Sequence, residues 1–406
     1  MLELNPTVSH KVDTWAVANQ KRSGRCWIFA GLNSLRGAIM AETKIKDFEL
    51  SQTYLHFWDK FEKANYFLSS MIELADRDEL DRTVSHLLGN PIDDGGQWNM
   101  FVALVEKYGV VPQYAMPETN SSSNTAKMNR DLEAVLRRAT MRIRGAAAGE
   151  RNGLREEALR DVWQVLTAHL GLPPEKFVWQ YRNKDDEFTR AGEFTPQQFA
   201  EKYLPGNLGE YVCVVNDPRH EYSKTYGVEY LGNVVGAKPV TYLNAPMEVL
   251  RNAVRESLVS HQRPVWFGCD TEAQADGEHG VWDPKLFDYS ATYGVDFSMN
   301  KLQRLVSGDS LMTHAMVFTG CDLAEMPNDE NSAAGTPTVN RWRVENSWGA
   351  DNADKGFWTM ADSWFDEYVF EVAVHRDLLP EEYQAALDTE PQMLPAWDPM
   401  GALAAR

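Results

Sequence analysis

The chain has 406 residues, of which 43% are hydrophobic, and it carries a formal net charge of −19 at pH 7. This length predicts two or three structural units with sizeable cores. The negative charge argues against nucleic-acid binding, because neutralising phosphates normally requires a basic surface. No run approaches the roughly 18–20 apolar residues of a membrane span, and the N-terminus has no basic, apolar signal segment. We therefore expect a cytoplasmic protein that is not attached to a membrane.

The four cysteines, Cys26, Cys213, Cys269 and Cys321, are widely spaced, and none belongs to a Cys-x-x-Cys pair. This spacing argues against a zinc site. Without a secretion signal it also argues against a disulfide framework. We expect neither a metal nor an organic cofactor. Three of the cysteines should be inert core residues, since thiols are usually buried.

The N-terminal part of the chain is predicted to be helical. Polar residues 20–25 lead into the first helix, which is apolar on most sides, and the second helix is rich in aromatic residues. Residues 90–97, Asn-Pro-Ile-Asp-Asp-Gly-Gly-Gln, should form a loop because proline and paired glycines break regular structure. The third helix should end at Gly109. The three helices are expected at residues 26–40, 51–70 and 98–108.

The texture of the sequence then changes twice. Residues 117–127 read as a polar linker, and residues 128–170 form a charged helical stretch that resembles an insertion. From about residue 210 the chain favours strands, and residues 391–406 are rich in proline and then small and apolar, as in an extended arm. A helical first half and a strand-rich second half predict an α+β fold. The strands are expected at residues 211–215, 265–269, 314–319 and 341–346.

Cys26 differs from the other cysteines in its position and its neighbours. It stands at the predicted N-terminus of a helix, where unpaired backbone N–H groups and the helix dipole favour the reactive thiolate. A lone cysteine is more often a buried structural residue. Here, however, the neighbours resemble those of papain-like peptidases, which carry an oxyanion-hole glutamine and the nucleophile at the positions of Gln20, Ser23–Gly24, Cys26 and Trp27. Ser23 replaces the disulfide-forming cysteine of secreted papains, which suits a reducing compartment.

A nucleophilic cysteine needs a base, and the base needs an orienting group. His314 precedes an apolar strand and, taken alone, would be read as a core or turn histidine. Downstream, Glu-Asn-Ser-Trp-Gly at 345–349 resembles the Asn-Ser-Trp-Gly of papain-like enzymes. In those enzymes the asparagine holds the imidazole and the tryptophan shields their hydrogen bond. The resemblance implies the same roles for Asn346 and Trp348, with His314 as the base.

The same resemblance assigns two further groups. Gln20 would donate its side-chain amide to the oxyanion, together with the backbone N–H of Cys26. Gln20 could instead be a solvated loop residue. Gly95 and Gly96 could be plain turn glycines. In papain-like clefts such a pair lets the substrate backbone approach closely, because glycine has no Cβ.

The spacing of these motifs points to one branch of the papain-like peptidases. Cys26 and His314 are 288 positions apart, against roughly 130–150 in simple papains. The chain resembles the bleomycin hydrolase family, which includes bacterial aminopeptidase C, over nearly its whole length. The most specific match is the end, Leu-Pro-Ala-Trp-Asp-Pro-Met-Gly-Ala-Leu-Ala. The segments that carry the resemblance are 51–60, 90–98, 265–270, 310–316, 343–349 and 394–404.

The resemblance implies a papain-like core, with a helical lobe and a β-barrel-like lobe, that carries helical and hook-like insertions. It also implies a ring-shaped homohexamer whose active sites face an inner chamber. The expected segments are a helical lobe with the nucleophile at 1–120, an inserted helical and hook region at 121–209, a β lobe with His and Asn and further insertions at 210–385, and a C-terminal arm in the active-site cleft at 386–406.

The function that the resemblance implies is a cysteine-type aminopeptidase that acts on peptides with a free N-terminus. The arm, ending near Ala404, would limit access to the cleft, and its carboxylate would pair with the substrate amine. Because Ala405 and Arg406 follow Ala404, we expect the enzyme to trim its own end. Two alternatives stay open: hydrolysis of a non-peptide amide or a thiolactone, and a non-catalytic ring that holds peptides.

Overall fold

The computed structural model describes residues 5–12, 15–324 and 338–403. Contacts within the chain divide it into two compact units, each made of separate stretches. We call them the helical unit and the β unit. The four-segment organisation expected from the sequence stays a prediction. The helical unit takes residues 20–209, 226–241 and 392 onward, and the β unit takes the stretch up to 19, 210–225 and 242–391.

Three helices of the helical unit lie where the sequence predicts them. The first begins at Cys26, and the third ends at Gly109, whose φ of +70° suits a glycine at a helix end. None of the helices in the described part of the chain is both long and apolar enough to cross a membrane. The helices are α1 (Cys26–Thr43), α2 (Gln52–Glu73), α3 (Arg82–Gly89), α4 (Trp98–Tyr108), α5 (Ala126–Gly145), α6 (Arg151–Leu170) and α7 (Pro196–Tyr203).

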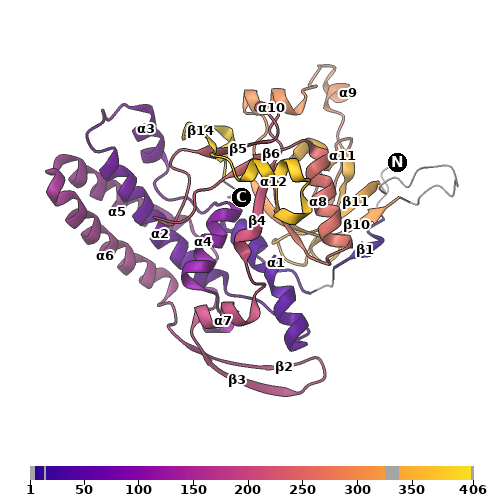
Figure 1. The fold of residues 1–406 in the computed structure, drawn as a ribbon, viewed down its shortest axis with the longest axis horizontal. Coiled ribbons are helices and arrows are strands. Elements are labelled where there is room, and N and C mark those ends of the chain that lie inside the picture. The colour runs from indigo at the N-terminus through magenta and orange to yellow at the C-terminus, as the bar shows by residue number, and fades with distance from the viewer. Residues whose placement is uncertain (1–4, 13–14, 325–337, 404–406) are drawn as a thin grey trace. The chain divides into compact units, whose positions relative to one another are not determined.

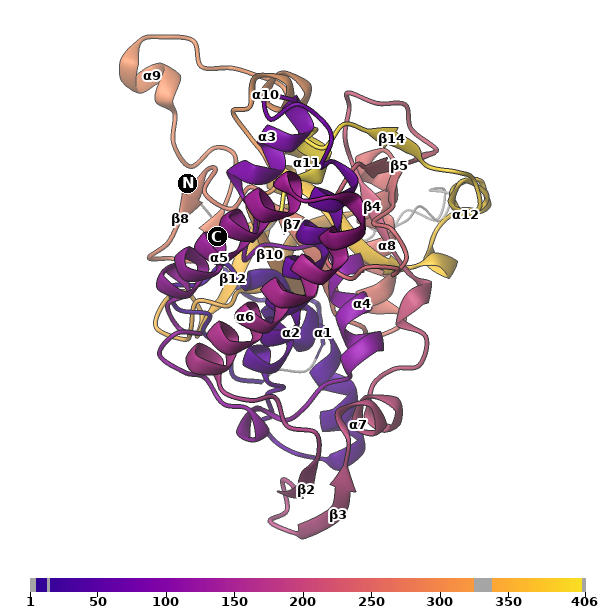
Figure 2. The same ribbon diagram turned by 90° about the vertical axis from the view of Figure 1, so that its left-hand side faces the viewer.

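The charged stretch 128–170 is helical, as predicted, but it is broken into two helices. A short turn after Gly145 separates α5 from α6, and the two helices lie side by side in both views (Figures 1 and 2). A two-stranded antiparallel hairpin, β2 (Phe177–Arg182) with β3 (Phe188–Phe194), follows them and extends beyond α7. The sequence analysis placed a hook region here without identifying strands.

The β unit is built on one mixed sheet. Its strands run in the order β6-β4-β13-β7-β10-β11-β12-β9-β8, and β1 adds to β10. All four strands predicted from the sequence are confirmed, as β4, β7, β10 and β11. The strands are β1 (His10–Lys11), β4 (Tyr211–Val215), β6 (Tyr242–Asn244), β7 (Val265–Cys269), β8 (Ala275–Asp276), β9 (Val281–Trp282), β10 (His314–Leu323), β11 (Val339–Glu345), β12 (Phe357–Ala361) and β13 (Val369–His375).

Helices cover this sheet, and aromatic side chains fill its core. The ring of Trp342 on β11 stacks on Phe365 of α11 at 5.1 Å, and Phe318 of β10 packs against both. Such pairs add to the stabilisation from buried apolar area. The helices of this unit are α8 (Met247–Val259), α9 (Tyr289–Tyr293), α10 (Lys301–Ser307), α11 (Asp362–Tyr368) and α12 (Glu381–Leu387).

The central strand β13 carries a buried glutamate. Glu371 is 2% exposed, and within the described residues its Oε1 has no hydrogen-bond partner. Burial raises the pKa of this carboxyl from 4.5 to about 7, although a hydrogen bond with Cys213 opposes the shift. The neighbouring Tyr242 has a pKa well above its usual value, because of burial and then the proximity of Glu371. Glu371 is therefore largely protonated in the folded protein below neutral pH.

This glutamate should make stability depend on pH. The unfolded chain releases the Glu371 proton at lower pH than the folded chain, so its contribution to stability is lost as pH rises from about 4.5 to about 7. The glutamine in Glu371→Gln does not titrate. The free energy of unfolding of this variant, relative to that of the wild type, should therefore rise by about 2–3 kcal/mol between pH 5 and pH 8. Urea denaturation of both proteins at the two pH values measures this. An equal difference in unfolding free energy between variant and wild type at pH 5 and at pH 8 would contradict this prediction.

Candidate active site

Cys26 is the first residue of helix α1, as the sequence predicts. The preceding residue, Arg25, makes no side-chain capping bond to the helix. Its guanidinium instead holds Glu118 with two hydrogen bonds of 2.9 and 2.8 Å, and its Nε donates to Ser23 Oγ at 2.9 Å. Helix α1 therefore begins at Cys26 without a side-chain cap, and the positive end of the helix dipole lies near the thiol. This position favours the thiolate.

The segment before the cysteine is fixed by its own side chains. We call residues 20–26 the nucleophile segment. Gln20 Nε2 donates to the carbonyl of Ser23 at 2.7 Å, and Ser23 Oγ donates back to the carbonyl of Gln20 at 2.7 Å. The oxyanion role of Gln20 stays a prediction.

The expected linker 117–127 does more than connect. Residues 117–125 lie outside helices and strands, as expected of a linker, while 126–127 already belong to α5, and Ser122 and Thr125 are buried. The backbone N–H of Arg22 donates to the carbonyl of Ser123 at 3.0 Å, and Thr125 N–H donates to the carbonyl of Arg22 at 3.3 Å. With the Arg25–Glu118 pair, these bonds hold the nucleophile segment in place.

Gly95 and Gly96 lie beside the nucleophile segment, within the same unit. We call residues 93–97 the glycine loop. Trp27 Nε1 donates to the carbonyl of Asp94 at 2.7 Å. A Cβ built on Gly96 would stand 2.5 Å from the Trp27 ring, so no side chain fits at that position. The structure therefore explains both motifs together: the loop backbone packs directly on the residue next to the cysteine.

A group of buried charges binds the glycine loop and was not predicted from the sequence. Lys60 and Asp59 are fully buried, and Lys63 and Asp94 nearly so. The only signal in the sequence is that two lysines and an aspartate interrupt an aromatic helix, α2. Charged residues are rarely buried unless they are paired.

In the β unit, His314 and Asn346 meet through their side chains. His314 is the first residue of β10, and Asn346 follows the last residue of β11. His314 Nε2 lies 2.9 Å from Asn346 Oδ1, and the backbone N–H of Ser347 donates to the same oxygen at 2.8 Å. Both His314 and Asn346 are buried.

These two bonds determine the tautomer of His314. A backbone N–H can only donate, so the atom that it reaches on Asn346 must be the amide oxygen. Nε2 of His314 then carries the proton and donates to that oxygen. The neutral ring therefore keeps Nδ1 as its basic nitrogen. This is the arrangement needed by a base that takes a proton through Nδ1.

Trp348 lies against the His314 ring, with the ring centroids 5.0 Å apart and inclined by 38°. The adjacent Gly349 has φ of +83°, and its N–H donates to the carbonyl of Ala18 at 3.1 Å. A Cβ there would meet Asn19 at 2.5 Å, so the turn requires glycine. The predicted residues therefore fall into two groups. Gln20, Cys26, Gly95 and Gly96 belong to the helical unit, and His314, Asn346 and Trp348 belong to the β unit.

The C-terminal arm returns to the helical unit. Strand β14 (Gln392–Leu394) pairs in parallel with β5 (Lys224–Val228). Further along, the Arg82 guanidinium lies 4.0 Å from the centroid of the Trp397 ring. Gln97 Nε2 donates to the carbonyl of Ala402 at 2.5 Å.

The arm thus reaches the residue that ends the glycine loop. A pocket of about 310 Å³ lies under it, lined among others by Lys63, Asp93 and Leu403. The predicted substrate-binding residue Ala404, with Ala405 and Arg406, lies outside the described residues.

The other three cysteines are buried and form no disulfide, consistent with the predicted core roles. Burial raises the pKa of Cys321 to about 11, which keeps this thiol protonated and unreactive.

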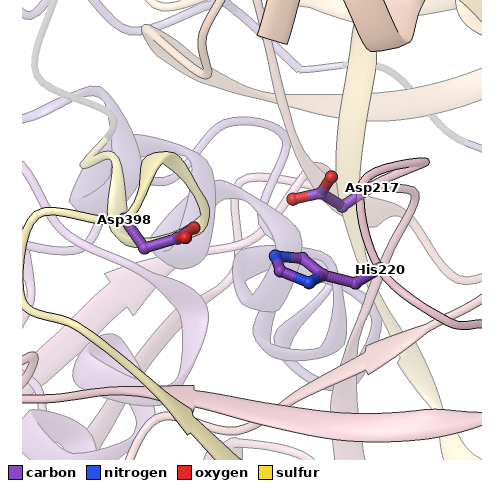
Figure 3. A group of neighbouring side chains, drawn as sticks. All are labelled: Asp217, His220 and Asp398. Carbon is purple, nitrogen blue, oxygen red and sulfur yellow. The ribbon is translucent and has the colours of Figure 1, made fainter. Parts of the chain in front are cut away.

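Two potential metal ligands, Asp217 and His220, lie on the loop that follows β4 (Figure 3). Asp217 already accepts two hydrogen bonds from the guanidinium of Arg219, at Nε–Oδ1 3.0 Å and Nη2–Oδ2 2.5 Å. Asp398, drawn in the same figure, belongs to the other unit, where it accepts from the N–H of Met400 at 2.9 Å. These carboxylates have structural roles within their own units. The expectation that the protein uses no cofactor stays a prediction.

Comparison with known proteins supports the assignment made from the motifs. A family model described as the Peptidase C1-like family matches residues 1–401. Aminopeptidase C of Listeria monocytogenes serovar 1/2a is 43% identical, covering 99% of this chain and 90% of its own. Bleomycin hydrolase of Mus musculus is 44% identical, covering 96% and 86%.

A solved structure agrees with these relatives. The crystal structure of PepW from Lactobacillus rhamnosis HN001 matches with a TM-score of 0.93 at 42% identity, covering 99% of this chain and 90% of that one. The α+β fold class and the resemblance to the bleomycin hydrolase family, both predicted from the sequence, are confirmed. The chain belongs to the Peptidase C1-like family of cysteine peptidases.

Proposed function

We propose that the protein is a cysteine-type aminopeptidase, with Cys26 as nucleophile and His314 as its base. The observation that carries the proposal is the hydrogen bond from His314 Nε2 to Asn346 Oδ1, which leaves Nδ1 free of that proton and able to accept one from a thiol. The position of Cys26 at the start of α1 supports it, because a helix N-terminus favours the thiolate. Both features are what a Cys-His-Asn acyl transfer requires.

In the proposed reaction, the Cys26 thiolate attacks the carbonyl carbon of the first peptide bond. The oxyanion of the tetrahedral intermediate accepts hydrogen bonds from the Gln20 side chain and the Cys26 N–H, and losing one such donor typically costs about 100–1,000-fold in rate. Protonated His314 gives its proton to the leaving amine, and an acyl-enzyme forms. His314 then takes a proton from the attacking water, and hydrolysis of the acyl-enzyme releases the N-terminal residue and restores the Cys26 thiolate with protonated His314.

The C-terminal arm would explain why the enzyme acts at the N-terminus of a peptide substrate. Its described part runs from β14 to the hydrogen bond between Ala402 and Gln97, beside the glycine loop. A carboxylate at the end of the arm would pair with the free amine of a substrate by a charge-assisted bond. The names of the relatives called aminopeptidase C support the same reading.

The test compares a peptide amide that has a free N-terminus with its N-acetylated form. We expect kcat/KM to be at least about 10-fold higher for the free form, because a hydrogen bond to a charged group contributes about 1.5–3 kcal/mol. Release of the N-terminal residue is followed by chromatography. Equal hydrolysis of both forms, or cleavage at internal bonds, would count against an aminopeptidase.

A second candidate function is hydrolysis of a non-peptide amide or a thiolactone by the same residues. It is favoured by the relatives whose name is bleomycin hydrolase. The comparison above can include such substrates at matched concentration, and the largest kcat/KM then identifies the preferred class. The proposal also includes the homohexamer that the family resemblance implies.

A further inference from the structure

A buried carboxylate connects the nucleophile segment with the glycine loop. Asp94 Oδ2 accepts from the backbone N–H of Gly24 at 3.1 Å. Its Oδ1 accepts from Lys60 Nζ at 2.6 Å and from Asn129 Nδ2 at 2.8 Å. The hydroxyl of Thr125 also donates to this carboxylate. Three separate stretches of chain thus bind the side chain of Asp94, a residue that is 8% exposed; we call this group the Asp94 clamp.

The backbone of the glycine loop is held from the same side. Lys60 and Lys63 donate to the carbonyl of Asp93 at 2.8 and 2.9 Å. Lys63 also donates to the carbonyl of Gly95 at 2.5 Å. Two ammonium groups on one helix therefore fix the positions of two loop carbonyls, and they restrict how the loop can turn.

Residue 94 contacts the chain on both sides of Cys26. Its carboxylate accepts from Gly24, two positions before the cysteine. Its carbonyl accepts from Trp27 Nε1, one position after the cysteine, at 2.7 Å. The packing of Gly96 on the Trp27 ring adds a steric contact to these two bonds. Residue 94 therefore connects the glycine loop to the chain on both sides of the thiol.

The charges of the clamp are balanced within the unit. Lys60 pairs with Asp94, and Lys63 pairs with Asp59 at 2.8 Å. Asn233 Nδ2 donates to Asp59 Oδ1 at 3.1 Å. Burial alone would raise the pKa of Asp94, but the charge of Lys60 and the hydrogen bonds to the carboxylate hold it well below its usual range. The carboxylate is therefore ionised, and its bonds are charge-assisted and strong.

We propose that Asp94 is a positioning residue: it holds the glycine loop at the distance from Cys26 at which a substrate backbone bound to the loop presents its carbonyl carbon to the sulfur. This inference rests on the proposed function only in assigning substrate binding to the glycine loop. The ties between the two segments exist without substrate. Loss of the carboxylate should loosen both segments together and misplace the bound peptide, while the reactivity of the thiol itself persists.

Asp94→Asn tests the proposal, because it keeps the size of the side chain and removes its charge. Hydrogen exchange should become faster at amides in both residues 20–26 and residues 93–97. We expect kcat/KM for an aminoacyl amide to fall about 10–100-fold, since a shift near 1 Å in the reacting groups has a cost of this size. Alkylation of Cys26 by iodoacetamide, which needs no glycine loop, should change little. A merely structural role would not separate the two rates.

Two further variants keep the test decisive. Asp94→Asn leaves Lys60 without its carboxylate, and an unpaired buried charge can prevent folding. The double variant Asp94→Asn, Lys60→Met removes both charges and should show the same separation of rates. Glu62→Gln is the matched control, because Glu62 is buried on the same helix and its pair with Lys107, at 2.6 Å, touches neither segment. It should lower stability but leave kcat/KM and the exchange of both segments unchanged.

The exchange measurement separates this inference from the proposed function. If the wild type releases no N-terminal residue, the proposed function fails, and faster exchange in both segments of the Asp94 variants still supports the clamp. If exchange in residues 20–26 is unchanged in the single and the double variant, the clamp is wrong. Alkylation and hydrolysis that fall by the same factor would also overturn the positioning role. The proposal predicts faster exchange in both segments and loss of hydrolysis alone.

Discussion

Cys26→Ala should abolish the release of N-terminal residues from a chromogenic aminoacyl amide. Alanine offers no nucleophile at the start of α1, so no acyl-enzyme can form. Removing the nucleophile of a comparable catalytic set costs on the order of 10⁶-fold in kcat. We therefore expect the rate of the variant to fall to background. Initial rates, measured on protein whose circular dichroism matches that of the wild type, give the answer.

Cys321→Ala is the matched control for this variant. Cys321 is also buried and outside any disulfide, but burial raises its pKa to about 11 and it cannot serve as a thiolate near neutral pH. Its replacement should leave kcat/KM close to that of the wild type. A chelator should leave the activity of both the wild type and the Cys321 variant unchanged. Residual activity in the Cys26 variant, or strong inhibition by EDTA, would indicate a different enzyme class.

Two of the proposed catalytic residues could be predicted from the sequence because each belongs to a local motif. Cys26 with Trp27 at a helix start, and Asn346 with Trp348 in a tight turn, are recognised from their neighbours within a few positions. The structure places Asn346 within hydrogen-bond distance of His314, although 32 positions separate them. That pairing follows from two adjacent antiparallel strands, β10 and β11, whose ends carry the two residues.

The groups that position these residues could not be identified in the same way. Asp94 stands in a stretch rich in Pro, Asp and Gly, which predicts only a loop. Its partners Lys60 and Asn129 lie on α2 and α5, where a charged or polar residue usually marks a solvated face. Only the packing of these helices shows that the residues are buried and bonded.

The strand β13 was also not predicted from the sequence. A glutamate interrupts its apolar run, Val-Phe-Glu-Val-Ala-Val, and a charged residue argues against a central strand. The structure resolves this conflict through the raised pKa of Glu371, which is largely uncharged below neutral pH. Hydrophobic periodicity alone does not carry that information.

Removing residues 402–406 should convert the enzyme from an aminopeptidase towards an endopeptidase. The deletion removes the hydrogen bond between Ala402 and Gln97 together with the end of the arm. Without the carboxylate at that end, the proposed recognition of a free amine is lost, and a hydrogen bond to a charged group is worth about 10–100-fold. We expect kcat/KM for N-terminal release to fall by that factor, and hydrolysis of N-acetylated peptides to rise by at least about 10-fold.

A substitution that keeps the chain length tests whether the position of the arm matters while the whole arm is still present. Gln97→Leu removes the donor to Ala402, and it removes no helix cap, because Gln97 makes no capping bond to α4. Gln97 is buried and its Oε1 has no partner within the described residues, so leucine should be accommodated. This variant should shift the preference in the same direction as the deletion but less far. If both variants keep the wild-type preference for a free N-terminus, the arm does not set it, and the preference must come from the cleft itself.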